Sequence, residues 1–165
     1  MITALTGFMG SGKSTVGREL ATLLGLPFID LDSYLEHKTG QSIPEILADG
    51  EDRFRALEAE AVRDIVIMRE IRNESAVVAL GGGTMGIKAI RHLLFGHMGL
   101  VYLRTGFDTI CGRLGEDRSS RPLFSEELYL KRLPIYEEAP MAVDTDGKDP
   151  GQIALEIRAL LDNNS

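Results

Sequence analysis

Near its N-terminus the chain reads Gly7-Phe8-Met9-Gly10-Ser11-Gly12-Lys13-Ser14-Thr15. This run matches the phosphate-binding loop pattern G-x-x-x-x-G-K-[ST], in which glycines let the backbone turn tightly and approach a phosphate. Successive backbone N–H groups then form an anion site, to which the positive end of the following helix adds. The Lys13 side chain can reach the β- and γ-phosphates, and the Ser14 hydroxyl suits Mg²⁺. We therefore predict a nucleoside triphosphate site formed by Gly10, Ser11, Gly12, Lys13, Ser14 and Thr15.

The residues that flank this loop support the prediction. Residues 2–5 form a short apolar run typical of a buried strand, and apolar residues recur at helical spacing over residues 16–24. A strand, a glycine loop and a helix are the context in which phosphate-binding loops occur. The alternative, a glycine-rich turn that binds nothing, is disfavoured by these flanks.

Length and composition indicate one globular domain over residues 1–165. The chain is 44% hydrophobic and 26% charged, and it contains no apolar run long enough to span a membrane. The loop begins at residue 7, which leaves no room for a signal peptide, so a cytoplasmic location is expected. The single cysteine, Cys111, excludes an intrachain disulfide and a cysteine-based metal site.

The net charge of −7 argues against binding of long nucleic acids by a broad basic surface. An anionic ligand is nevertheless implied by the phosphate-binding loop. The basic side chains that serve it must therefore be concentrated at one site, so the position of each arginine is informative.

Two carboxylates follow the second predicted strand, residues 28–30. Ligands of open parallel sheets bind beyond the carboxyl ends of the strands, so Asp30 and Asp32 are functional candidates. Asp30 is a better candidate for orienting Mg²⁺ than Asp144, because the strand after the first helix normally lies close to the first strand. An alternative role for Asp32 is to cap a helix over residues 33–38, and capping and function are compatible.

A short helix that starts near Ser42 and a longer one with apolar residues at 3–4 spacing over residues 54–71 come next. Arg55 and Glu58 lie three residues apart on the longer helix, and the residues alone favour a simple surface pair. A third strand, residues 77–80, ends in the triple glycine 81–83. Three glycines suit the close approach of a ligand or of the phosphate-binding loop, and a flexible turn is the alternative.

The second half of the chain continues the alternation of strands and helices. We expect helices over residues 87–95, 107–114 and 126–138 and a last one from residue 150 that is capped by Asp149, with strands over 100–103 and 141–143. Between residues 115 and 124 lies a polar segment with two arginines, which suits either a mobile lid or a solvated loop. Five strands alternating with helices predict an α/β fold in which a parallel sheet is covered on both faces.

Several of these motifs together resemble the shikimate kinase family. The resemblance spans residues 2 to about 160. It rests on the phosphate-binding loop extended to Gly17, on residues 28–32, on Gly50-Glu51 before Phe54-Arg55 and Glu58, on the triple glycine and on Arg121-Pro122-Leu123.

The resemblance implies a three-layer P-loop fold like that of nucleoside monophosphate kinases, with strand order 2-3-1-4-5. It implies a lid over about residues 112–124 and substrate-binding helices over about residues 33–60. It also implies transfer of the ATP γ-phosphoryl group to the 3-hydroxyl of shikimate in aromatic amino-acid biosynthesis. Mg²⁺ would accompany ATP, and a kinase of this size can work as a monomer.

The resemblance also assigns roles to individual residues. Arg55 and Arg132 would clasp the shikimate carboxylate, since an arginine forks well onto a carboxylate. Asp32 would hold ring hydroxyls and act as the base. The remaining implied roles are substrate contacts at Gly81 and Gly82, Mg²⁺ ordering by Ser14 and Asp30, charge neutralisation by Lys13 and Arg121, and adenine-side contacts at Arg113 and in residues 144–150.

Two other functions are compatible with parts of the sequence. A related small-molecule kinase such as a gluconate kinase would also use a carboxylate-binding arginine, although the triple glycine and Phe54-Arg55 favour shikimate. A nucleotide-binding module without catalytic activity is disfavoured, because Lys13, Asp32 and Arg121 are all competent residues. The three histidines are scattered and more typical of surface or core positions than of ligands.

Overall fold

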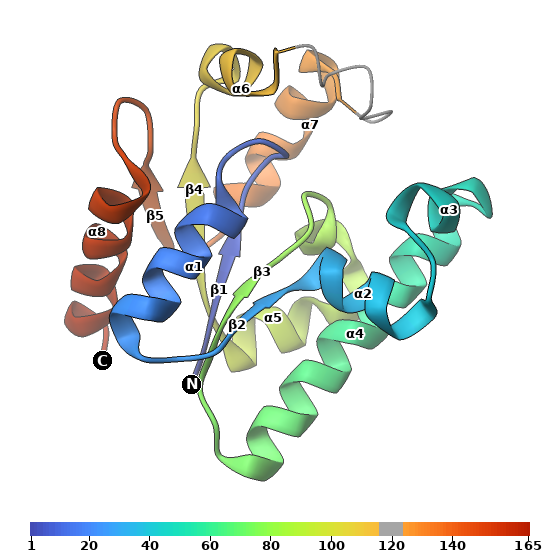
Figure 1. Ribbon diagram of the computed structural model, residues 1–165, viewed down its shortest axis with the longest axis horizontal. Helices are drawn as coiled ribbons and strands as arrows, with labels where there is room; N and C mark the ends of the chain where they lie inside the picture. Colours follow the sequence, from blue (N-terminus) through green and yellow to red (C-terminus); the bar gives the residue numbers. More distant parts are fainter. Residues whose placement is uncertain (116–123) are drawn as a thin grey trace.

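The computed structural model describes residues 1–115 and 124–165, and its sheet has the predicted order (Figure 1). Five parallel strands are arranged as β2-β3-β1-β4-β5, and β1 pairs with β3 on one side and with β4 on the other. The strands are β1 (Ile2–Thr6), β2 (Phe28–Asp30), β3 (Ala76–Ala79), β4 (Met98–Arg104) and β5 (Met141–Asp144).

Helices connect these strands in the manner of a parallel α/β protein. In the described residues they are α1 (Lys13–Leu24), α2 (Leu31–Thr39), α3 (Ile43–Ala48), α4 (Glu51–Arg72), α5 (Arg91–His97), α6 (Phe107–Leu114), α7 (Glu126–Tyr136) and α8 (Pro150–Asn163). Two short 3₁₀ turns, η1 (Thr84–Gly86) and η2 (Lys88–Ile90), precede α5. No helix of the described residues is long and apolar enough to cross a membrane.

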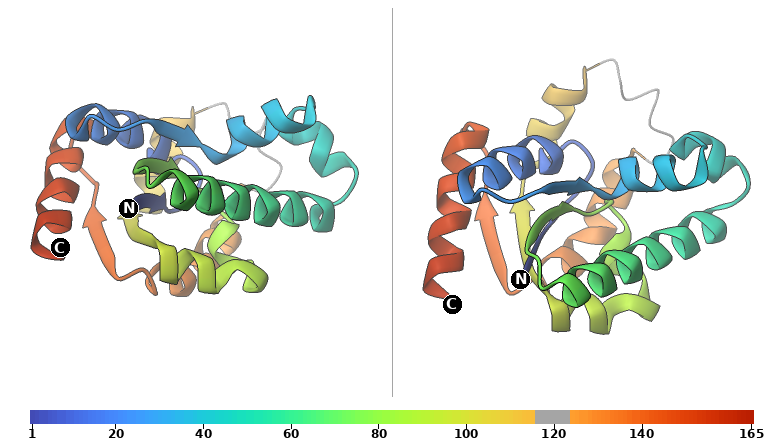
Figure 2. Two further views of the ribbon diagram at one scale, coloured as in Figure 1. Left: turned by 90° about the horizontal axis from the view of Figure 1, so that it is seen from below. Right: turned by 60° about the horizontal axis from the view of Figure 1, so that its bottom comes forward.

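Helices cover both faces of the sheet, as the alternation of elements predicts. Helices α1 and α8 pack against each other on one face, and the core there includes Leu5, Leu20 and Ile157. Helix α4, with α5 and α7, covers the other face, where Val62 and Leu100 are buried in a larger core (Figure 2). The carboxyl ends of the five strands therefore open between these helical layers.

The turn from β1 into α1 depends on glycine at its last position. Gly12 is the N-cap of α1 and has φ +93°, a left-handed conformation that residues other than glycine rarely adopt. Because Gly12 also has no side chain, it does not cap the first-turn N–H groups of α1. These groups are therefore available to an anion.

Asp30 rather than Asp32 caps α2, so the capping interpretation of Asp32 is wrong. The Asp30 carboxylate accepts a hydrogen bond from the Ser33 backbone N–H at 3.1 Å, and the helix begins at Leu31. Asp32 lies in the first turn instead and has no capping role. The predicted caps of α3 and α8 are confirmed as capping boxes formed by Ser42 and by Asp149.

Two segments differ from the prediction. The expected helix over residues 87–95 is instead η2 followed by α5, because the backbone is extended at Ile87 (ψ 103°) and leaves the helical conformation again at Ile90 (φ −115°, ψ 4°). In α4, Met68 and Ile71 do not continue the buried stripe and are 46% and 76% exposed. The last turns of α4 run past the end of the sheet, where fewer elements pack on them (Figure 1).

Candidate active site

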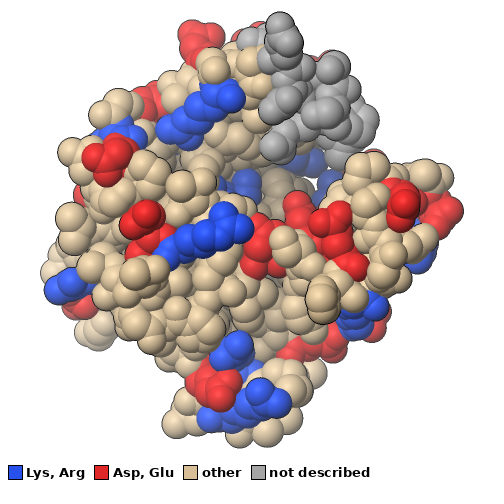
Figure 3. All heavy atoms as spheres, viewed as in Figure 1, with Lys and Arg blue, Asp and Glu red and all other residues tan. Residues whose placement is uncertain are grey.

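Two pockets meet at the triple glycine beyond the carboxyl ends of β1 and β3. The phosphate pocket, about 230 Å³, is lined by Met9, Gly10, Gly12, Lys13, Ser14, Thr15, Asp30, Asp32, Leu80, Gly81 and Gly82. The arginine pocket, about 400 Å³, is lined by Glu51, Arg55, Gly83, Gly86, Ile87, Leu128, Lys131, Arg132 and Ile135. Figure 3 shows the surface hollowed here, with basic side chains inside the hollow and acidic ones along its border.

The phosphate-binding loop is a cradle of backbone groups with cations above it. Lys13 folds back over the loop and donates hydrogen bonds to the carbonyl oxygens of Gly7 (2.8 Å) and Phe8 (3.0 Å). Arg113 of α6 also approaches the loop, and its Nη1 lies 3.4 Å from the Gly10 carbonyl oxygen. The structure thus brings the predicted nucleotide-site residues of the loop, together with Arg113, to one place.

Ser14 and Asp30, the predicted Mg²⁺ pair, are in direct contact. The Ser14 hydroxyl donates to one carboxylate oxygen of Asp30, while the other oxygen caps α2. A hydroxyl and a carboxylate that share one edge of the phosphate pocket offer the hard oxygen atoms that Mg²⁺ prefers. The donor set fits Mg²⁺ held between protein and phosphates, with water completing its shell.

Asp32 projects into the same pocket. Its side chain is open to solvent on the pocket side, yet protein atoms surround it closely enough to remove part of its hydration. This burial, followed by the negative charge of Asp30, raises the pKa of Asp32, whereas Lys13 and, more weakly, Arg55 lower it. A carboxylate with a raised pKa beside a phosphate cradle is suited to accepting a proton.

Arg55 is held by a buried acid, so the interpretation of a plain surface pair is wrong. Arg55 Nη1 lies 2.7 Å from Glu58 Oε1, and the Glu58 side chain is 0% exposed. The other Glu58 oxygen accepts a hydrogen bond from the buried Thr84 hydroxyl at 2.8 Å. Burial raises the pKa of Glu58, and the charge of Arg55 and the Thr84 bond oppose that rise. Glu51 at 3.4 Å and the ring of Phe54 complete the surroundings of the guanidinium.

Arg132, on α7, faces the same pocket from the opposite side. Its guanidinium lies 5.9 Å from the centre of the Phe8 ring, within the range of a cation–π contact. It also lies next to Gly82, where a Cβ would be 3.1 Å from Arg132 Nη1. Arg55 and Arg132 therefore present two guanidinium groups to one cavity, as expected for a carboxylate clasp.

The triple glycine is a wall without side chains between the two pockets. A Cβ on Gly83 would lie 2.5 Å from Arg55 Nη2, and one on Gly81 would lie 3.0 Å from the Thr84 hydroxyl and 3.6 Å from Asp32 Oδ1. The phosphate-binding loop does approach, as predicted, since a Cβ on Gly82 would lie 3.7 Å from the backbone N of Met9, but the closest approaches are those of side chains. Functional side chains from four elements converge on this short segment.

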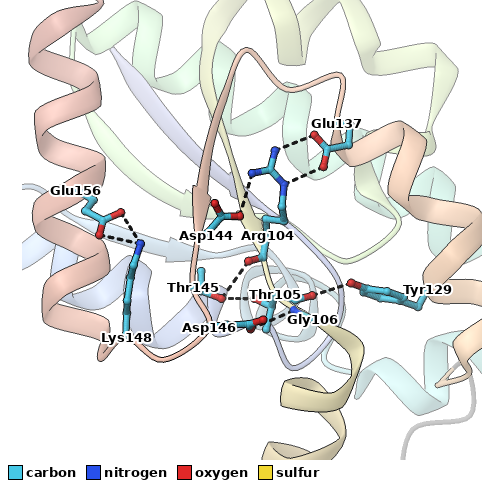
Figure 4. Close-up of polar contacts among 10 residues, drawn as sticks. All are labelled: Arg104, Thr105, Gly106, Tyr129, Glu137, Asp144, Thr145, Asp146, Lys148 and Glu156. Carbon is cyan, nitrogen blue, oxygen red and sulfur yellow. Dashed lines mark hydrogen bonds and ion pairs between the residues drawn. The ribbon is translucent and has the colours of Figure 1, made fainter.

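The predicted adenine-side segment, residues 144–150, follows β5 and is tied to the end of β4 (Figure 4). The Thr105 and Thr145 hydroxyls lie 2.5 Å apart, and the Gly106 N–H donates to Asp146 at 3.1 Å. Arg104 donates to Glu137 and to Asp144, each at 2.9 Å. Asp144 is thus committed to Arg104, which agrees with the preference for Asp30 as the Mg²⁺-ordering acid.

Some predicted features lie outside the described residues. Arg121 and most of the expected lid over residues 112–124 fall between residues 116 and 123. Of the flanking residues, Phe124 stacks on Phe107 with ring centres 5.5 Å apart. Of the other individually predicted site residues, Ser11 and Arg113 line neither pocket, and the rest lie along the walls of the two adjoining pockets.

Two residues at the site carry no signal in the sequence patterns considered above. Thr84 contacts Glu58, which is 26 residues away in sequence, so no local spacing indicates the pair. Tyr136 reads only as an apolar helix residue, yet its hydroxyl donates to the Gly82 carbonyl oxygen at 2.6 Å. Its position four residues after Arg132, on the same face of a helix, is a usable signal for a shared site.

Comparison with known proteins agrees with this geometry. The family model described as shikimate kinase matches residues 9–162. A shikimate kinase from Thermus thermophilus is 42% identical over 93% of this chain and 85% of its own length. The structure of the Acinetobacter baumannii shikimate kinase in complex with shikimate superposes with a TM-score of 0.88 at 34% identity, over 99% of this chain and 94% of that one.

A gluconokinase structure from Sinorhizobium meliloti also superposes, with a TM-score of 0.61 at 22% identity over 98% of this chain and 94% of that one. An identity this low shows a common fold and no more.

A parallel sheet of order 2-3-1-4-5 and a phosphate-binding loop beside a second, arginine-lined pocket define a P-loop kinase that phosphorylates a small molecule. The matches narrow this class to one group. The chain belongs to the shikimate kinase family.

Proposed function

We propose that this protein transfers the γ-phosphoryl group of ATP to the 3-hydroxyl of shikimate, giving shikimate 3-phosphate and ADP. The observation that carries the proposal is the pairing of Arg55 and Arg132 across one pocket that adjoins the phosphate-binding loop. Membership of the shikimate kinase family supports it.

The acceptor occupies the arginine pocket with its carboxylate between the two guanidinium groups. Each guanidinium can form paired N–H···O bonds to a carboxylate, which fixes the ring as well as binding it. Shikimate then extends past the triple glycine, where Gly81 and Gly82 offer backbone and Asp32 offers a carboxylate to the ring hydroxyls. This orientation directs one hydroxyl at the phosphate pocket.

The chemistry is an in-line displacement at phosphorus. The 3-hydroxyl oxygen forms a bond to the γ-phosphorus, and the bond from that phosphorus to the β–γ bridging oxygen breaks, leaving its electron pair on ADP. The proton of the 3-hydroxyl passes to Asp32, whose raised pKa suits it to receive one. Positioning and charge neutralisation supply most of the acceleration of such a reaction.

Charge on the transferring group is balanced by cations. Lys13 lies at the phosphate pocket in the described structure, and Arg121 is proposed to enter from the lid over residues 112–124. Ser14 and Asp30 would hold Mg²⁺, which when bound neutralises the β- and γ-phosphate oxygens. Arg113 and residues 144–150 are proposed to contact the nucleoside.

We further propose that residues 1–165 form a single kinase domain that works as a monomer. Helices within about residues 33–60 line the acceptor side of the site. Size-exclusion chromatography with light scattering checks the monomer, which predicts a mass near 18.1 kDa.

The test is ADP release from Mg·ATP with shikimate, with gluconate and with no acceptor. Stimulation by shikimate alone supports the proposal. Stimulation by gluconate instead would retain the fold and the phosphate chemistry but overturn the acceptor assignment. ATP binding without stimulation by either acceptor would favour a non-catalytic nucleotide-binding module.

A further inference from the structure

Tyr136 lies at the last position of α7 and is 1% exposed, with its hydroxyl at the triple glycine. Its ring stacks on that of Tyr102, with ring centres 5.3 Å apart and an angle of 29° between the ring planes. The hydroxyl donates to the Gly82 carbonyl oxygen at 2.6 Å. The side chain is thus fixed at both ends, by packing at its ring and by a short hydrogen bond at its tip.

The same hydroxyl also contacts Arg132. A phenol has one proton to donate, and here that proton goes to Gly82, so its lone pairs remain to accept a hydrogen bond from the guanidinium. Gly82 completes the triangle, because a Cβ there would lie 3.1 Å from Arg132 Nη1 and 3.8 Å from the Tyr136 hydroxyl oxygen. One hydroxyl therefore bridges the middle glycine of the pocket wall and an arginine of the carboxylate clasp.

We propose that Tyr136 is a positioning residue for the acceptor, which holds the Arg132 guanidinium against the Gly82 backbone so that both meet the acceptor carboxylate in one fixed arrangement. This inference rests on the proposed function, since it concerns the same pocket. It adds to that function a tyrosine that does not line either pocket.

The physical reason is the freedom of a long side chain. An arginine loses much rotamer entropy when it binds, and a group that already fixes it reduces that loss at the moment of binding. Without the hydroxyl, the face of the Phe8 ring still attracts Arg132 but does not fix the direction of its N–H groups. Burial raises the pKa of Tyr136 to about 12, so the hydroxyl keeps its proton throughout the neutral range.

Tyr136→Phe is the direct test, because it removes only the hydroxyl and retains the ring stack. We expect the KM for shikimate to rise about three- to tenfold, the effect of one lost hydrogen bond. The KM for ATP is expected to change less than about twofold, since the phosphate-binding loop is untouched. An equal rise in both constants, or none in that for shikimate, would overturn the proposal.

Tyr129→Phe is the matched control. Tyr129 is also on α7, and its hydroxyl likewise donates to a loop carbonyl oxygen, that of Thr105 at 2.8 Å (Figure 4). Tyr129→Phe removes the same kind of hydrogen bond as Tyr136→Phe, so a general loosening of α7 would affect both variants alike. We expect the KM for shikimate to be unchanged in Tyr129→Phe, and a similar rise in both variants would contradict a specific role for Tyr136.

A double-mutant cycle tests whether Tyr136 acts through Arg132. In an Arg132→Lys background, which lacks the guanidinium fork, Tyr136→Phe is expected to raise the KM for shikimate by less than about 1.5-fold further. Full additivity of the two effects would show that the hydroxyl does not work through the arginine. The cycle is measured both by steady-state turnover and by calorimetry of shikimate binding, so that the affinity of variants with low activity can still be determined.

Gly82→Ala perturbs the same Arg132 guanidinium from the side of the pocket wall, and it provides the test if Tyr136→Phe does not fold. Its Cβ would crowd Arg132, and we expect the same selective rise in the KM for shikimate. A parent-like KM in Gly82→Ala would contradict the fixed arrangement. If the parent protein does not phosphorylate shikimate, the proposed function is wrong. If the parent is active and the variants have its KM for shikimate, only the inference on Tyr136 is wrong.

Discussion

The Arg55 guanidinium lies directly over the backbone of Gly83, so closely that a Cβ at that glycine would be 2.5 Å from Nη2 and 2.6 Å from Cζ. Non-bonded heavy atoms do not approach to this distance, and Glu58 ties the guanidinium down at 2.7 Å. Gly83 therefore allows one arm of the carboxylate clasp to reach its place.

Gly83→Ala is accordingly expected to displace Arg55 and raise the KM for shikimate by about tenfold or more, since a charge-assisted bond contributes about 1.5–3 kcal/mol. The KM for ATP should change little. Steady-state kinetics with each substrate varied in turn checks this. Gly96→Ala in α5 is the control, because a Cβ there would have nothing within 4 Å and alanine favours the helix. A normal KM in Gly83→Ala would show that Arg55 can move without loss.

Arg55→Ala is expected to weaken shikimate binding by about 10- to 100-fold while ATP binding holds, because Arg55 lines the arginine pocket and not the phosphate pocket. The control is Arg53→Ala on the same helix, whose guanidinium is occupied with Asp49 (3.0 Å) and Gln41 (2.9 Å) at the surface. Isothermal titration with each ligand separates the two affinities. Loss of ATP affinity with retained acceptor affinity would show that Arg55 is wrongly assigned.

Asp32→Asn is expected to lower kcat by about 10²- to 10⁴-fold, the usual contribution of a positioned base. The same substitution is expected to stabilise the folded protein. The folded-state pKa of Asp32 is raised, so stability falls as pH rises from the unfolded-state pKa through the folded one. Removing the charge is therefore expected to raise the melting temperature at neutral pH, which lies above the unfolded-state pKa. Thermal melts of parent and variant at pH 7 check this, and a variant that turns over at the parent rate would exclude Asp32 from the chemistry.

Thr84→Val is expected to raise the pKa of Glu58 further, because the Thr84 hydroxyl bond stabilises the carboxylate. The raised folded-state pKa means that stability falls with rising pH across the window above the unfolded-state pKa, and the variant widens that window. The free energy of unfolding, measured in urea, should therefore fall more between pH 5 and pH 8 in Thr84→Val than in the parent. Thr84→Ser retains the hydroxyl and should follow the parent. If Thr84→Val lowered the free energy of unfolding by the same amount at both pH values relative to the parent, this explanation would be wrong.

Ser14→Ala is expected to raise the Mg²⁺ concentration needed for half-maximal activity, because it removes a hydroxyl from the proposed metal site beside Asp30. Removal of Mg²⁺ with a chelator should abolish ADP release in the parent and the variant. A titration of ADP release against Mg²⁺ measures the shift. An unchanged midpoint would place the metal elsewhere.

Much of the fold could be predicted because its signals are local. The glycine loop, the apolar strands and the caps at Ser42 and Asp149 each act within a few residues, and all of them are found in the structure. The error at Asp32 was also local: Asp30 and Asp32 both fit a helix cap, and only the backbone conformation decides between them. Residue type alone does not fix which of two neighbouring acids turns back to a backbone N–H.

The site was predicted less completely, for a physical reason. The resemblance pointed to Arg55 and Arg132, which lie beside the triple glycine, but their supports come from distant parts of the chain. Burial of Glu58 depends on α4 facing the larger core. The spacing of Arg55 and Glu58 predicts a solvated surface pair, whereas the structure contains an ion pair to a buried carboxylate. The bond from Tyr136 to Gly82 crosses 54 positions in the sequence. Such contacts follow from packing and not from spacing.

The wall of glycines between the phosphate and arginine pockets has a consequence for inhibitor design. Because the phosphate pocket is lined by Gly82 and the arginine pocket by the next residue, Gly83, one molecule can carry a polyphosphate mimic into the first and a carboxylated ring into the second. A linked compound of this kind loses its translational and rotational freedom once instead of twice, which favours it over two separate fragments. Selectivity over other phosphate-loop enzymes would then reside in the half that meets Arg55 and Arg132, and the spacer would need to be narrow rather than long.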